Sequence, residues 1–236
     1  MAVDIVPEML ERIKKQVSDR MEKDSTIRRL KKLFDDGKGT YKEANEFAIR
    51  CGEILADAYR MNVSEAELPS GRMWFNIADR VLTPTLAQNY EEIARACEKA
   101  QKNINDEIRV GLRVIKPDEN QSRIRNLVQK ISEYESFADG EWLLAEPILN
   151  ISQSVVDDAI KANMEFQGKS GIQATIRRTV AGSCCEWCSK IAGKYTYPDM
   201  PKEVFQRHED CECIIEYTPT RTGLTEKLIG KGKSWK

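Results

Sequence analysis

Apolar residues recur at helical spacing along most of the chain. From Ile5 to Met21 they fall every three or four positions, which places them on one face of a helix. Thr40 and Glu43 form a T-x-x-E capping box, a pattern typical of a helix start. The same periodicity predicts further helices over residues 27–34, 44–58, 73–81, 86–112, 124–131 and 148–164.

Glycine and proline punctuate these helices. The run D-D-G-K-G at 35–39 ends the second helix, because Gly is favoured just beyond a helix end. Pro69 and Gly71 mark a linker over 61–71. Pro84 predicts a break between the helices at 73–81 and 86–112, since proline is disfavoured in a helix interior and fits the first turn of a new helix. Turns at 116–120 and 135–142 separate the later helices.

The pattern changes after the segment G-K-S-G. Residues 172–180 alternate and are rich in β-branched side chains, which indicates a strand, and 193–197 and 213–217 read as two more. We therefore predict an α+β fold, in which a mostly helical region is followed by a small antiparallel sheet. The expected division is a helical region at 1–140, a C-terminal domain of one helix and the sheet at 141–220, and a flexible basic tail at 221–236.

Composition narrows the class of protein. The chain has 236 residues, 41% hydrophobic and 32% charged, which suits one or two soluble domains with a true core. Its net charge of −1 gives no global attraction to nucleic acid or membrane. No apolar run reaches the length of a membrane span, and the N-terminus does not read as a signal peptide. We expect a protein that stays in a reducing cytoplasm.

Five of the seven cysteines and the only histidine gather in one stretch near the C-terminus. Thiolate and imidazole are the ligands that zinc prefers, and a closed set of four makes a structural site. The preferred set is Cys185, Cys188, His208 and Cys211, with Cys213 as the substitute, and Cys184 is expected to point away. We call these five preferred and substitute residues, Cys185, Cys188, His208, Cys211 and Cys213, the Cys/His cluster. Cys211 and Cys213 are expected to lie on one face of a strand, because side chains alternate there. Alternatively, His208 and Cys211 meet across a turn.

Other interpretations of the cluster stay open at this level. Closely spaced cysteines can form a redox site, disulfides, or reduced thiols that pack as small apolar side chains. A cysteine beside a histidine can also be a nucleophile pair. The spacing does not follow the commonest zinc-finger templates.

Several other polar or reactive residues have structural explanations. Cys51 and Cys97 lie on apolar helix stripes and are expected to be core thiols. Asp157 and Asp158 are adjacent on a helix and face different directions, so we expect a solvated face rather than a paired site. The tail at 227–236 carries four lysines and a tryptophan, which suits either a solubilising tail or contact with a phosphate backbone. No P-loop, G-x-G-x-x-G, H-E-x-x-H or G-x-S-x-G motif is present.

One set of motifs resembles a known family. The run L-A-E-P-I-L-N-I-S-Q-S-V-V-D-D-A-I-K-A-N, the C-x-x-C-x-x-x-A-G motif and the R-H-x-x-C-x-C motif resemble tailed-phage head morphogenesis proteins similar to the F protein of phage Mu. The resemblance covers residues 143–217, and in that family the two Cys motifs are expected to come together. The motif residues of this chain are Cys185, Cys188, Ala192, Gly193, Arg207, His208, Cys211 and Cys213.

The resemblance implies a minor head protein and not an enzyme. Such a protein acts near the portal during head assembly, so its implied partners are portal and major capsid proteins and also phage DNA, with no membrane. Its implied location is the virion, and the host cytoplasm during assembly. Zinc is the expected structural ion.

Two alternatives belong to other functional classes. The first is a nuclease-like or toxin-related enzyme in which His208, with Glu209 or Asp210, performs acid–base chemistry. The second is a zinc-ribbon module that binds nucleic acid or regulates, with the basic tail on the phosphates.

Overall fold

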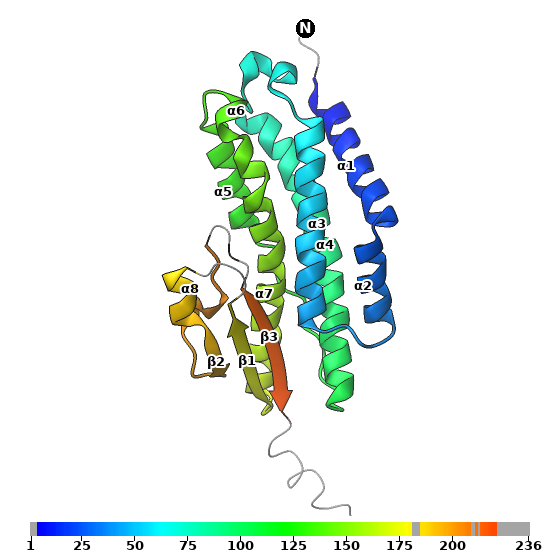
Figure 1. Ribbon diagram of the computed structural model, residues 1–236, viewed down its shortest axis with the longest axis vertical. Helices are drawn as coiled ribbons and strands as arrows, with labels where there is room; N and C mark the ends of the chain where they lie inside the picture. Colours follow the sequence, from blue (N-terminus) through cyan, green and yellow to red (C-terminus); the bar gives the residue numbers. More distant parts are fainter. Residues whose placement is uncertain (1–3, 181–184, 209–210, 212, 221–236) are drawn as a thin grey trace, which may run out of the picture.

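The helices run along the length of an elongated molecule, and a small sheet lies against one side of them (Figure 1). The computed structural model describes residues 4–180, 185–208, 211 and 213–220. The long helices are α1 (Val6–Lys23), α2 (Ser25–Asp35), α3 (Tyr41–Asn62), α4 (Phe75–Glu107), α5 (Gln121–Ser132) and α7 (Glu146–Lys169). Short helical turns are η1 (Glu65–Glu67), η2 (Pro69–Gly71), α6 (Phe137–Gly140), η3 (Glu141–Leu144), α8 (Glu186–Ile191) and η4 (Lys202–Phe205).

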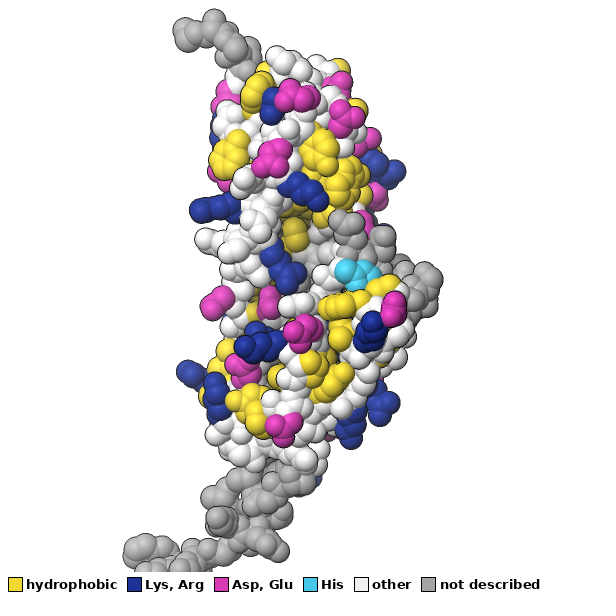
Figure 2. Space-filling model, turned by 90° about the vertical axis from the view of Figure 1, so that its left-hand side faces the viewer, with side chains coloured by type: hydrophobic (Ala, Val, Ile, Leu, Met, Phe, Trp, Pro, Cys, Tyr) yellow, Lys and Arg dark blue, Asp and Glu magenta, His cyan; other side chains and the backbone are white. Residues whose placement is uncertain are grey.

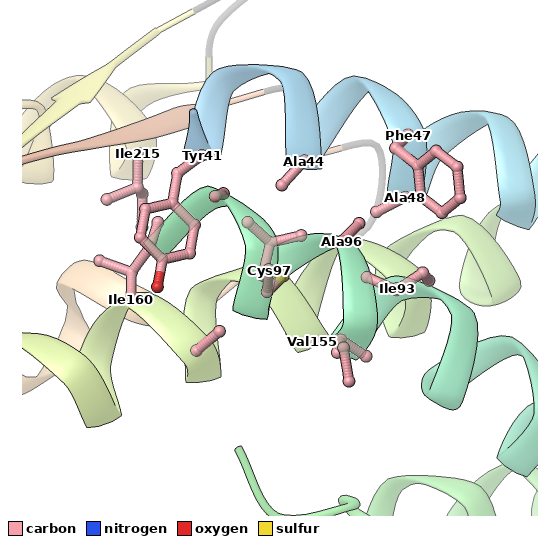
Figure 3. Packing of buried hydrophobic residues seen from close by; sticks show 14 of the residues in the cluster. Tyr41, Ala44, Phe47, Ala48, Ile93, Ala96, Cys97, Val155, Ile160 and Ile215 are labelled. Atoms are coloured by element: carbon pink, nitrogen blue, oxygen red, sulfur yellow. The ribbon is translucent and has the colours of Figure 1, made fainter. Parts of the chain in front are cut away.

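Helix α3 occupies the centre of the bundle. It packs against α7 along one side, against α4 on another, and against α1 and α2 on the outside. In Figure 3 the ring of Tyr41 of α3 points toward Ile160 of α7 beside Ile215 of β3, and Phe47 lies farther along α3. Because its apolar stripe packs against several neighbours, buried residues occur from Tyr41 at the start of α3 to Tyr59 near its end.

The sheet has three antiparallel strands in the order β2–β1–β3, where β1 is Gln173–Thr179, β2 is Gly193–Thr196 and β3 is Ile214–Thr220. Ala174 and Ile176 of β1 and Ile215 of β3 join the same hydrophobic core as α3, α4 and α7. The sheet therefore does not have a separate core of its own. The predicted boundary between residues 140 and 141 stays a prediction.

A buried chain of polar side chains fastens the end of the sheet to the helices. Tyr41 donates to Gln101 at 2.9 Å, and Gln101 donates to Asn105 at 2.8 Å. Gln167 also donates to Asn105, and its own oxygen accepts from Tyr217 of β3. Buried polar groups need partners, so this chain favours one docked position of β3 over others.

The structure confirms the α+β class and the periodicity that predicted it. The Thr40–Glu43 capping box is present, and the predicted strands coincide with β1, β2 and β3 to within a few residues. Among the described residues, no helix combines the length and the apolar character needed to cross a bilayer.

Two helix boundaries were predicted wrongly. Helix α4 runs through Pro84 without a break, with Val81, Leu82 and Leu86 buried on both sides of it. Burial of a continuous apolar stripe outweighs the hydrogen bond that proline removes. Helix α4 then ends at Glu107, short of the predicted end at 112, because Arg109 takes a positive φ of 54° that leaves the helical conformation.

Candidate metal centre

The first half of the Cys/His cluster lies at the start of α8. Cys185 is the N-cap residue, and its sulfur accepts the backbone N–H of Cys188 at 3.3 Å. Cys188 lies in the first turn and is buried, whereas Cys185 is exposed. The C-x-x-C spacing thus forms a helix cap that turns both sulfurs toward the same side.

The second half comes from the loop between η4 and β3. His208 is half-buried, and Cys211 and Cys213 are buried. On the face shown in Figure 2, the histidine reaches the surface beside hydrophobic side chains. The expectation that Cys211 and Cys213 share a strand face is wrong, because β3 begins only at Ile214 and both cysteines precede it.

The two halves meet at the sulfur of Cys188. Its Sγ lies 2.9 Å from His208 Nε2 and 3.9 Å from Cys211 Sγ, and the Sγ of Cys185 lies 3.1 Å from the same histidine nitrogen. Cys185, Cys188 and His208 form one group of donors within 4.8 Å of one another, and Cys188, Cys211 and Cys213 form another. Either group could hold a metal ion.

The donor set and its spacing suit a tetrahedral ion of the zinc type. Zinc–sulfur bonds near 2.3 Å and zinc–nitrogen bonds near 2.0 Å hold ligand atoms roughly 3.5–3.8 Å apart. The distances around Cys188 bracket that range, and the two groups of three donors share Cys188, so a four-ligand centre would draw donors from both groups around that sulfur. Five donors are offered where four suffice, and geometry alone leaves Cys211 and Cys213 as alternatives.

The two cysteines of the C-x-x-C have opposite electrostatic environments. The pKa of Cys185 is lowered, because the backbone N–H of Cys188 donates to its sulfur. Burial raises the pKa of Cys188, and the nearby sulfurs of Cys213 and Cys211 raise it further. These surroundings favour the protonated thiol of Cys188 over the thiolate. A bound divalent ion reverses that balance, because a coordinating thiol loses its proton.

A buried ion pair ties the ligand loop to α7. Arg207 binds Asp157 with both ends of its guanidinium, at 2.5 and 3.0 Å, and each side chain is only 2% exposed. The same Arg207 donates to the backbone carbonyls of Cys211 and Cys213 at 3.2 and 3.0 Å. Asn150 of α7 adds a hydrogen bond to the carbonyl of His208.

The prediction of a solvated face is thus wrong for Asp157, which is buried, whereas Asp158 is half-buried. Asp157 stands three residues before Ile160 on the same helical stripe. That position was the available signal that its carboxylate faces inward.

Sequence reasoning also missed Arg178 and Trp187. Arg178 of β1 is buried and donates to the sulfur of Cys211 at 3.4 Å. Trp187 packs edge-on against His208, with ring centroids 5.6 Å apart, and its ring lies 5.5 Å from the guanidinium of Arg178. The alternation of β1 puts Arg178 on the same face as Ala174 and Ile176, which could have revealed it.

The remaining cysteines divide clearly. Cys51 and Cys97 are buried in the helical core as predicted, and burial raises the pKa of both thiols. Within the described part of the chain, Cys51, Cys97, Cys188, Cys211 and Cys213 form no disulfide. The Cys188–Cys211 separation of 3.9 Å is much longer than a disulfide bond. Cys184, Glu209, Asp210 and the tail at 227–236 lie outside the described residues.

No family model, no curated protein and no solved structure matches this chain.

Replacing Asp157 by alanine tests the ion pair. The change leaves the buried Arg207 guanidinium without its counter-charge, and breaking a buried pair in this way costs about 3–5 kcal/mol. We expect D157A to lower the free energy of unfolding by that amount in urea denaturation. The neighbouring D158A serves as the control and should change stability by less than about 1 kcal/mol. Equal stability of D157A and D158A would contradict the assigned role of the pair.

Proposed function

We propose that this chain is a minor head protein of a tailed phage, and that its Cys/His cluster is a structural zinc site. The observation that carries the proposal is the meeting of the C-x-x-C and R-H-x-x-C-x-C motifs at the sulfur of Cys188, which lies 2.9 Å from His208. These are the motifs by which the sequence resembles the head morphogenesis proteins. Their convergence supports the proposal, because the two motifs are expected to come together in that family.

Zinc is the proposed ion because the donors are soft and are numerous enough to fill all of its coordination positions. Thiolates and an imidazole hold zinc tetrahedrally, and a site with four protein ligands has no open position for a substrate. The Nε2 atom of His208 faces the sulfurs of Cys185 and Cys188. This contact supports a ligand role for His208 over general acid–base chemistry.

The proposed role of the ion is to join α8 to the η4–β3 loop, which Arg207 already ties to α7. In chain order, the ligands on α8 precede β2 and η4, and the ligands on the η4–β3 loop follow them. One ion would therefore join the two ends of the segment from α8 to β3. A three-stranded sheet has too little apolar surface to be stable alone. The zinc would therefore fix α8 and the ligand loop beside the sheet.

The helical bundle is the proposed contact region for other head proteins. Four large apolar side chains are exposed where α3 ends, where α4 begins and in η3, namely Met61, Trp74, Phe75 and Trp142. Exposed apolar side chains of this size suit a protein partner. We propose the portal and major capsid proteins as partners, with phage DNA as a further candidate, and the virion and host cytoplasm as locations.

Mass spectrometry of purified particles from an induced lysogen that carries the gene tests the head assignment. We expect this chain in procapsids and mature particles at a small number of copies relative to the major capsid protein. Empty particles and host proteins that co-purify give the background level. Absence from both particle types would overturn the assignment to the head and leave the metal site unaffected.

Replacing Cys188 by serine tests the zinc site. Cys188 is the donor shared by both groups, so C188S should lose bound zinc in elemental analysis. At free zinc of 100 times Kd, the bound ion stabilises the fold by about 2.7 kcal/mol, and the variant should lose this stabilisation.

The matched control is C97S, which alters another buried thiol far from the cluster in sequence. It should lose some stability through the buried hydroxyl but keep its zinc. A chelator should lower the melting temperature of wild type and C97S, and leave that of C188S unchanged. A full complement of zinc in C188S would rule the site out.

A further inference from the structure

Arg178 is a charged side chain in a position where the fold offers an apolar environment. It lies on β1, the central strand, and faces the core with only 2% of its surface exposed. Within the described part of the chain, no carboxylate forms an ion pair with it, and its Nε atom is buried without a hydrogen-bond partner. An isolated buried charge is costly, so a compensating negative charge is expected beside it.

The guanidinium points toward the Cys/His cluster. Its Nη1 donates to the carbonyls of Val204 and Gln206 at 2.5 and 2.9 Å, which fixes the loop that leads to His208. Its Nη2 donates to the sulfur of Cys211 at 3.4 Å. Arg178 thus binds both the backbone that precedes His208 and a candidate ligand atom, the sulfur of Cys211.

The net charge of a zinc centre explains why a cation is buried beside the cluster. A zinc ion with three thiolates and one neutral imidazole carries one net negative charge. Arg207, the other buried cation near the cluster, is already paired with Asp157. Arg178 therefore remains to balance the centre, and its N–H···S contact selects one sulfur on which that charge is best stabilised.

Cys211 and Cys213 differ in this respect. The sulfur of Cys211 accepts from Arg178 and lies 3.9 Å from the sulfur of Cys188. The carbonyl oxygens of both cysteines accept from Arg207, so only the sulfur contact with Arg178 distinguishes them. The contact from a buried cation thus falls on the sulfur of Cys211.

We infer that Arg178 is the charge partner of a centre formed by Cys185, Cys188, His208 and Cys211, and that it makes Cys211 rather than Cys213 the fourth ligand. This inference rests on the proposed zinc site. Arg178 is a positioning residue that acts through the sulfur it contacts. The centre it favours is one for a soft cation with three thiolates.

A double-mutant cycle measured by zinc affinity tests the inference on the full chain. Affinity is obtained by competition with a chromophoric chelator. We expect R178M to weaken zinc binding by about 10- to 100-fold, the usual effect of removing a partner of a metal ligand. The same loss should appear in the C213S background. In the C211S background R178M should have little further effect, because the sulfur it acts on is gone.

Cobalt substitution gives a second readout that does not depend on affinity. The thiolate-to-cobalt charge-transfer absorption per bound cobalt should be unchanged in C213S, and in C211S it should fall in proportion to the loss of one thiolate of three. R178K keeps the charge but not the planar fork, so its zinc affinity should lie between those of wild type and R178M. Should R178M not fold, R178K and the two cysteine variants still decide the question.

The outcomes separate the inference from the proposal beneath it. Equal zinc affinity of R178M and wild type, or loss of cobalt–thiolate absorption in C213S and not in C211S, would overturn the role of Arg178 and leave the zinc site intact. A wild-type chain that takes up no zinc at saturating concentration would overturn both.

Discussion

The buried ion pair between Asp157 and Arg207 is the constraint on which the candidate site depends. Asp157 belongs to α7, which packs along α3, so its position is fixed by the main core. Arg207 binds that carboxylate and the carbonyls of Cys211 and Cys213 together. The loop that carries half of the cluster is thereby held in register with the helices. Burying both charges is costly, and each partner compensates for the other.

One end of the sheet is fastened to the helical core, and the Cys/His cluster lies at its other end. Near Tyr217, the polar chain through Gln167 and Asn105 fastens β3 to the bundle. At the other end, α8 contacts the η4–β3 loop through Trp187, His208 and the cysteines. A metal ion at this end would supply what a short, irregular segment cannot obtain from apolar burial. The proposed zinc and the polar chain would then stabilise opposite ends of the sheet.

Sequence periodicity predicted the helices and the strands, because those features depend on local spacing. The meeting of the two halves of the cluster was implied by the family resemblance. Periodicity did not predict that α4 continues through Pro84, since that depends on neighbours that bury the stripe on both sides. The inward positions of Asp157 and Arg178 were readable from helical and strand periodicity, but their significance required knowing where Arg207 and Cys211 lie. The choice of four metal ligands among the five donors depends on distances between side chains, and these distances cannot be read from the spacing of residues along the chain.

The most direct test of the central claim is native mass spectrometry of the full chain purified under reducing conditions without added metal. The account predicts one bound zinc ion per chain, lost on acidification together with a return to the mass of the reduced polypeptide. A chain of reduced mass that binds no zinc even after zinc is supplied would contradict it. So would a mass lowered by a pair of hydrogens for each disulfide, because the cysteines would then be bonded to one another.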